Sequence, residues 1–128
     1  MKNEFINNSD LHFEHKQWRS EFSFWEDELK TFNNRLEELV KRWTDKTVLA
    51  QLEHFQNQFI RHGEVIDTLQ HDINVHETNM AAHDEKGEDV INRALAKHHI
   101  EFRGRMETQR KIYGDLKKDF YRFLSKFM

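Results

Sequence analysis

Large apolar residues recur at alternating steps of four and three over most of this chain, and this spacing restricts the fold more than any other feature. In an α-helix such spacing places every member on one face, which we call the seam of that helix. The first segment therefore predicts a helix from about residue 9 to residue 43. Its seam, with one histidine included, is Leu11, His15, Trp18, Phe22, Trp25, Leu29, Phe32, Leu36, Leu39 and Trp43.

Two later segments repeat the pattern and predict helices over about residues 47–83 and 88–127. The second seam is Val48, Leu52, Phe55, Phe59, His62, Ile66, Leu69, Ile73, His76, Met80 and His83. The third is Ile91, Leu95, His98, Phe102, Met106, Gln109, Tyr113, Leu116, Phe120, Phe123 and Phe127. Two successive steps of four around Phe102 indicate a local unwinding of the supercoil. The chain has no Pro and four Gly, so few breaks are expected.

The connections between the segments indicate their arrangement. Thr44, Asp45 and Thr47 are candidate caps for the second helix, and so short a turn returns it along the first. In antiparallel helices, seam residues at the same level have numbers with a constant sum. A sum of 91 between the first two helices, and of 174 or 175 between the last two, leaves turns of the short length that helical bundles use. We expect a single all-α domain over residues 1–128, an antiparallel up-down-up three-helix bundle with long coiled-coil-like helices and a spectrin-repeat-like architecture. The alternative is a helical hairpin or swapped form that closes its core by dimerising.

The composition excludes several classes of protein. The absence of Cys rules out disulfides, thiolate metal sites and Cys nucleophiles. Residues 1–10 are polar and do not resemble a signal peptide, and no apolar run is long enough to span a membrane. The sequence therefore predicts a cytoplasmic protein. It also contains no phosphate-binding glycine loop or catalytic signature, so we expect no enzyme.

Basic residues are concentrated in the third segment. From Lys97 onward there are nine Lys or Arg and four acidic residues, whereas the first 96 residues hold 11 basic and 19 acidic ones. A basic helix between two acidic helices helps to select this topology. The alternative is a basic strip for an acidic partner, but the net charge of −3 argues against nucleic acid or a membrane as partner.

Most histidines fall at the end of the predicted bundle that lies away from Asp45. In the predicted register His15, His76 and His98 share one layer between two apolar layers. Three neutral imidazoles that meet at one axis form a candidate site for divalent Zn, Cu or Fe and leave a coordination position open. Further ligands, or hydrogen-bond acceptors for the ligand rings, would come from nearby side chains. These are His12, Asp72, His83 and Glu101.

Two other interpretations of the histidine layer remain open. Crowded histidines repel one another when protonated, so the layer can act as a pH sensor. A polar layer can also serve only to fix the register of the helices. His62 is different, because its layer contains Tyr113 and predicts a hydrogen bond between the two side chains.

The sequence thus predicts a non-enzymatic helical bundle that serves as a protein-interaction or self-associating module and carries a candidate transition-metal site. Its partner would be another protein or a second copy in a homo-oligomer. The alternatives are a protein whose main role is metal binding, sensing or storage, and a small metal-dependent enzyme. The narrow axis of a three-helix bundle leaves little space for a substrate and disfavours the enzyme.

Overall fold

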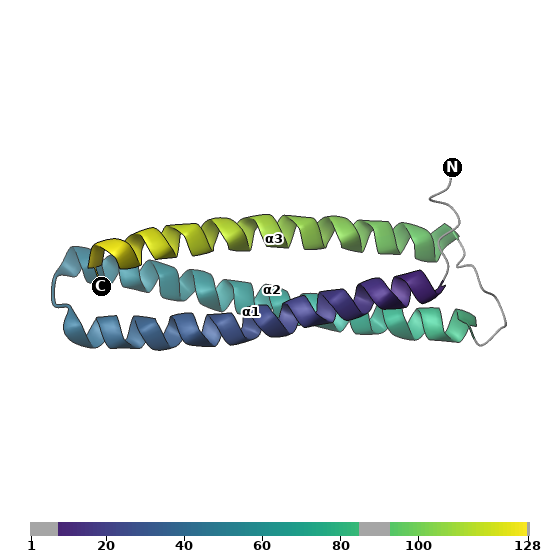
Figure 1. Cartoon of the computed structure of the whole chain (residues 1–128), viewed down its shortest axis with the longest axis horizontal. Coiled ribbons are helices and arrows are strands. Elements are labelled where there is room, and N and C mark those ends of the chain that lie inside the picture. Colours follow the sequence, from purple (N-terminus) through teal and green to yellow (C-terminus); the bar gives the residue numbers. More distant parts are fainter. Residues whose placement is uncertain (1–7, 85–92, 128) are drawn as a thin grey trace.

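The computed structural model describes residues 8–84 and 93–127, with side chains for 10–82 and 93–127, and this part of the chain forms three long helices (Figure 1). They are α1 (Asn8–Arg42), α2 (Lys46–Asp84) and α3 (Arg93–Phe127). Helices α1 and α3 run in one direction and α2 runs in the other. The predicted all-α, up-down-up three-helix bundle is therefore confirmed. The 39 residues of α2 span roughly 58 Å at ~1.5 Å per residue.

The turn between α1 and α2 forms where the sequence predicts it. The Asp45 side chain caps α2, since its Oδ1 accepts hydrogen bonds from the backbone N–H groups of Thr47, at 2.8 Å, and Val48, at 3.2 Å. An Asp in this position satisfies N–H groups that have no partner inside the helix. The predicted start of the third helix at residue 88 and the seam position Ile91 lie outside the described residues.

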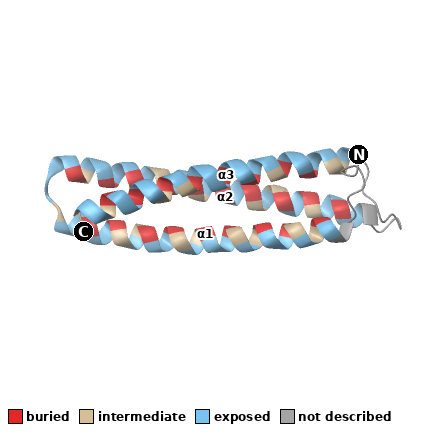
Figure 2. Cartoon of the chain, turned by 45° about the horizontal axis from the view of Figure 1, so that its top comes forward, coloured by how far each residue is buried: buried red, intermediate tan, exposed pale blue. Residues whose placement is uncertain are grey.

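Buried residues recur along each of the three helices (Figure 2), and their side chains form the core of the bundle. Near Asp45 the core contains an aromatic cluster, in which the ring centroids of Phe32 and Phe59 lie 5.4 Å apart and those of Phe59 and Phe120 lie 5.0 Å apart. Trp43 closes this end, because its indole N–H donates to the carbonyl of Phe127 at 3.0 Å. Phe32 and Phe59 are a pair that the predicted register joins.

The seam of α3 differs from the prediction at one position. His99 is fully buried, whereas His98 is exposed. With His99 in the seam, the steps from Leu95 to Phe127 alternate between four and three without interruption. The irregularity predicted around Phe102 followed from placing His98 in the seam, and α3 is continuous through this region.

Helices α1 and α3 are parallel, and a constant offset relates their contacting residues. His15 and His99 are 84 residues apart, as are Trp43 and Phe127. The rings of Trp18 and Phe102, which have the same offset, lie 5.0 Å apart. The two helices therefore keep one register along their length.

Ion pairs between the acidic side of α1 and the basic side of α3 recur once per heptad. The paired atoms lie 2.9, 2.7 and 2.9 Å apart. Residues that flank the seam are placed to make such contacts between neighbouring helices. The pairing agrees with the predicted role of the charge asymmetry in selecting the topology. We call it the charge ladder, and its pairs are Glu14–Arg103, Glu21–Arg110 and Glu28–Lys117.

None of the helices in residues 8–84 and 93–127 combines the length and the apolar character that crossing a bilayer demands. The cytoplasmic location stays a prediction.

Candidate metal centre

One imidazole from each helix reaches a common point in the interior. His15 of α1 and His99 of α3 are 0% exposed, and His76 of α2 is 6% exposed. Their ring centroids lie 5.1 to 5.6 Å apart. One ring nitrogen from each of the three lies within 4.8 Å of the others. The three side chains therefore form a group that can hold a metal ion, and we call it the histidine triad.

The triad contains two of the three predicted ligands. His15 and His76 are in it, and His99 occupies the place expected for His98. The side chain of His98 is exposed, and its ring centroid lies 6.0 Å from that of His76. Consecutive residues of a helix point about 100° apart, so only one of His98 and His99 can face the axis.

The other predicted residues lie around the triad or away from it. His12 is half-exposed and donates from Nδ1 to Glu77 at 2.9 Å. Asp72 forms an ion pair with Arg105 at 2.8 Å, and Glu101 is exposed beside a groove between α2 and α3. The side chain of His83 lies outside the described part of the structure.

Two carboxylates fix the orientation of two triad rings. Glu77 accepts a hydrogen bond from Nδ1 of His15 at 2.9 Å, and Glu14 accepts one from Nε2 of His99 at 2.6 Å. A carboxylate oxygen only accepts, so these two ring nitrogens carry the protons. In the neutral rings the opposite nitrogens, Nε2 of His15 and Nδ1 of His99, then both present lone pairs to each other at 3.2 Å. This contact is favourable only when a cation, either a proton or a metal ion, lies between them.

Both carboxylates are ionised at neutral pH. Burial alone would raise the pKa of Glu14, but hydrogen bonds from Arg103 and His99 outweigh it and leave the pKa lowered. The pKa of Glu77 is lowered in the same way, because hydrogen bonds and charge interactions from His15 and His12 outweigh burial. Each carboxylate is therefore held in the form that accepts hydrogen bonds from the imidazoles.

The three imidazoles are held in the neutral form that binds metals. Burial lowers the pKa of His15 and of His99, although Glu77 and Glu14 partly oppose this. Burial, followed by repulsion from the neighbouring histidines, lowers the pKa of His76 to about 4. Because a metal ion and a proton compete for the same lone pair, these shifts favour the metal at neutral pH.

His76 contributes a nitrogen without a partner. Its Nε2 is buried, and among the described residues it has no hydrogen-bond partner. Leaving such a group unsatisfied costs about 1–3 kcal/mol. Rotation of the His76 ring toward the other two breaks no hydrogen bond of this nitrogen, and a bound ion would supply the missing partner.

The separation of the facing nitrogens suits a metal ion. Two imidazole nitrogens bonded at 2.0–2.1 Å to a tetrahedral Zn²⁺ lie roughly 3.3 Å apart. Nε2 of His15 and Nδ1 of His99 lie 3.2 Å apart. The Trp18 ring covers them on one side and stacks on His99 with a centroid distance of 5.0 Å and an interplanar angle of 26°. Such cover excludes water and strengthens electrostatic interactions inside the site.

Three residues of the candidate site were missed by the sequence prediction: His99, Glu14 and Glu77. The constant offset of 84 between α1 and α3 pairs His15 with His99 and not with His98, and this signal is present in the sequence. Glu14 and Glu77 each adjoin a triad histidine in the chain but bond to a histidine of another helix. Which histidine each carboxylate reaches depends on the rotation of the helices about their axes, and the spacing of the seam does not specify that rotation.

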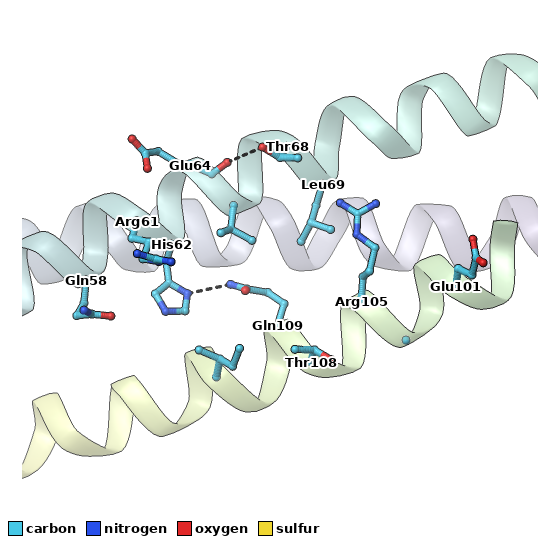
Figure 3. A pocket seen from close by; sticks show the side chains of 13 residues that line it. Gln58, Arg61, His62, Glu64, Thr68, Leu69, Glu101, Arg105, Thr108 and Gln109 are labelled. Atoms are coloured by element: carbon cyan, nitrogen blue, oxygen red, sulfur yellow. Dashed lines mark hydrogen bonds between the residues drawn. The ribbon is translucent and has the colours of Figure 1, made fainter.

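A groove between α2 and α3 with a volume of about 980 Å³ is the second feature of functional interest (Figure 3). At its base Gln109 donates from Nε2 to Nδ1 of the buried His62 at 3.0 Å. His62 thus bonds to Gln109 and not to Tyr113 as predicted, because the Tyr113 hydroxyl donates to Glu28 at 2.8 Å. The wall of the groove includes Gly104, where an added Cβ would meet open space.

Comparison with known proteins finds no family model, curated protein or solved structure that matches the chain. Its function is therefore inferred from its own geometry.

Proposed function

We propose that this protein binds a transition metal ion through His15, His76 and His99. The observation that carries the proposal is the pair of facing nitrogens on His15 and His99. Carboxylates on the far sides of these rings direct both lone pairs inward, and one ring nitrogen of His76 lies within 4.8 Å of a ring nitrogen of each. Metal-binding histidines in proteins commonly donate their second N–H to a carboxylate in this way.

The chemistry of the donors limits the ions that fit. Neutral imidazoles suit Zn, Cu and Fe and are poor ligands for Mg²⁺ or Ca²⁺, which prefer oxygen. Three histidines leave one coordination position of a tetrahedral ion for another ligand. The proposal concerns binding without catalysis, because buried residues above and below the triad leave little space for a substrate. These are Leu11 and Met80 on one side and Trp18, Ile73 and Phe102 on the other.

Metal titration of protein purified without a histidine tag tests the proposal. Metal-free protein is titrated with Zn²⁺ in competition with a chromophoric chelator, and bound metal is measured by elemental analysis. We expect one ion per chain in the wild type and loss of that ion in His76→Ala and His99→Ala. His98→Ala and His54→Ala are the controls, since both side chains are exposed. No uptake by the wild type, or equal uptake by His99→Ala, would overturn the proposal.

We also propose self-association through the groove between α2 and α3, with a second copy of the chain as the occupant. Val65 and Ile112 leave apolar surface on its two walls, being 37% and 50% exposed. Each wall also carries one basic and one acidic side chain, namely Arg61 and Glu64 on α2 and Arg105 and Glu101 on α3. A two-fold contact brings the same patch of two copies together, and mixed charges allow opposite signs to meet.

Light scattering over a range of protein concentrations tests self-association. We expect a concentration-dependent dimer in the wild type and a monomer in Gly104→Arg, which fills the groove. We expect the substitution to leave the monomer folded, because a Cβ added at Gly104 meets no atom of another helix within 4 Å. Gly114→Arg is the control on the same helix, since Gly114 is equally open but does not line the groove. A wild type that stays monomeric, or a Gly104→Arg dimer, contradicts self-association through this groove.

A further inference from the structure

The apolar layer next to the triad, on the side away from Trp18, contains a methionine. Leu11 and Met80 are fully buried there and Leu95 is packed against them. Met80 follows His76 by four residues on α2, so the two side chains lie on the same helix face, one above the other. A thioether sulfur therefore stands one layer from three imidazole nitrogens.

The direction of the helices decides which side chain of this layer leans toward the triad. Helical side chains point back toward the N-terminus of their own helix. Leu11 and Leu95 precede the triad residues of α1 and α3, so they lean away from the triad. Met80 follows the triad residue of the oppositely directed α2, and it is therefore the member of the layer that leans toward the imidazoles.

Contacts on the opposite side of the triad follow the same rule. Trp18 and Phe102 come after His15 and His99 in their helices and should lean toward the triad. The Trp18 ring centroid lies 5.4 Å from that of His15 and 5.0 Å from that of His99, and Phe102 packs on Trp18 at 5.0 Å. Trp18 thus leans toward the triad from one side, as the rule assigns to Met80 on the other side.

Building on the metal-binding function proposed above, we propose that the sulfur of Met80 is the fourth ligand of the triad and that the completed site selects monovalent copper. A thioether is a soft ligand that favours Cu(I) over Zn²⁺. Methionine is unbranched and flexible, so its sulfur can move onto an ion held by the three rings.

The charge and the burial of the site support the same ion. Three neutral imidazoles and a thioether bring no charge, and a single positive charge costs less to bury than a double one. The nearby carboxylates already have cationic partners, since Glu14 pairs with Arg103 at 2.9 Å and Glu77 lies 3.8 Å from Arg19. The buried Met80 and Leu11 also keep water from the fourth position, which Zn²⁺ sites commonly fill with water.

Copper and zinc affinities of matched methionine variants test the proposal. Metal-free protein is titrated with Cu(I) under anaerobic, reducing conditions against a chromophoric Cu(I) chelator, and separately with Zn²⁺. We expect Met80→Leu to weaken Cu(I) binding by about tenfold or more, in the range typical of lost metal-site interactions, and to leave Zn²⁺ affinity unchanged. Met106→Leu is the control, because Met106 is equally buried but lies beyond Phe102 on α3. Leucine keeps the volume of methionine, so both variants should fold.

X-ray absorption at the copper edge provides a second measurement that needs only the wild type. We expect a sulfur atom among the copper ligands of the wild type and of Met106→Leu, and its absence in Met80→Leu. A wild-type spectrum with nitrogen ligands alone, or equal Cu(I) affinity in Met80→Leu, overturns the role of Met80. Loss of Zn²⁺ binding in His76→Ala would then still uphold the proposed function. A wild type that binds neither ion overturns both.

Discussion

Nε2 of His15 and Nδ1 of His99 face each other at 3.2 Å, although 84 residues separate them in the chain. The other ring nitrogen of each histidine donates a hydrogen bond to a carboxylate, that of Glu77 for His15 and that of Glu14 for His99. This arrangement fixes which lone pairs point inward, and it leads to predictions about the carboxylates, the histidines and the scaffold that holds them.

Replacing Glu77 by Gln should weaken metal binding about 10- to 100-fold, the range found when a carboxylate behind a ligand histidine is lost. The amide cannot polarise the N–H of His15 as a carboxylate does, and its NH₂ group can also turn toward the ring. The measurement is the Zn²⁺ dissociation constant by competition titration. Glu21→Gln is the matched control, because Glu21 pairs with Arg110 in the charge ladder and, within residues 10–82 and 93–127, bonds to no histidine. Equal losses in both variants would contradict a role for Glu77 in orienting His15.

The free energy of unfolding of the metal-free protein should fall as the pH drops from about 6.5 to 4. The pKa of His76 is about 4 in the folded chain and 6.5 when unperturbed, so the unfolded chain binds more protons between these values. The contribution of neutral His76 to the free energy of unfolding is therefore fully present above pH 6.5. It is lost as the pH falls to 4, by an amount on the order of 3 kcal/mol. Urea unfolding in EDTA at several pH values measures it.

The same series on two variants separates His76 from the rest of the chain. His76→Leu should make the pH dependence between pH 6.5 and 4 shallower, because the triad histidine with a pKa of about 4 has been removed, while the lowered pKa values of His15 and His99 leave part of the slope. His54→Leu, at an exposed position, should leave the slope unchanged. A His76→Leu curve parallel to the wild-type curve would contradict the assignment.

Reversing one charge in the ladder should destabilise the bundle, and reversing its partner as well should restore stability. Arg110→Glu places a second carboxylate next to Glu21, where the guanidinium of Arg110 now lies 2.7 Å from the Glu21 carboxylate. Because both groups are partly exposed, we expect a loss of about 1 kcal/mol. Thermal unfolding of Arg110→Glu, Glu21→Arg and the double variant measures the coupling. A double variant as unstable as the sum of the single ones would show that the pair does not interact.

Phe120→Ala should destabilise the protein by about 3–5 kcal/mol, since it opens a cavity among closely packed rings. Phe120 is fully buried, with ring centroids of Phe32, Phe55 and Phe59 within 5.2 Å. Chemical denaturation measures the loss. Phe13→Ala is the control, because Phe13 is 64% exposed and its removal should change stability by less than about 0.5 kcal/mol.

The three-helix bundle could be predicted because the seam spacing, the cap at Asp45 and the short turn all require the same arrangement. Leu36, Leu52 and Ile66 occupy the buried positions that the spacing assigns to them. Local sequence contains this information, since each seam residue is fixed by neighbours three and four positions away.

The triad was predicted only in part because two adjacent histidines compete for one place in α3. A rotation of about 100° about the helix axis separates His98 from His99, and a register sum of 174 or 175 does not distinguish them. The parallel pairing of α1 with α3 does distinguish them, through Trp18 and Phe102 one layer away. The carboxylates Glu14 and Glu77 depend on side-chain directions across helices, which seam spacing does not specify.

The distribution of the triad over all three helices has a consequence for protein synthesis. A growing chain that ends before residue 99 contains His15 and His76 but lacks the third donor, and the hairpin of α1 and α2 cannot complete the site alone. If the triad binds an ion as proposed, binding by all three histidines must wait until α3 has emerged from the ribosome and docked. An ion held by all three histidines would then link the first helix to the last, so its release would require that these two helices separate locally.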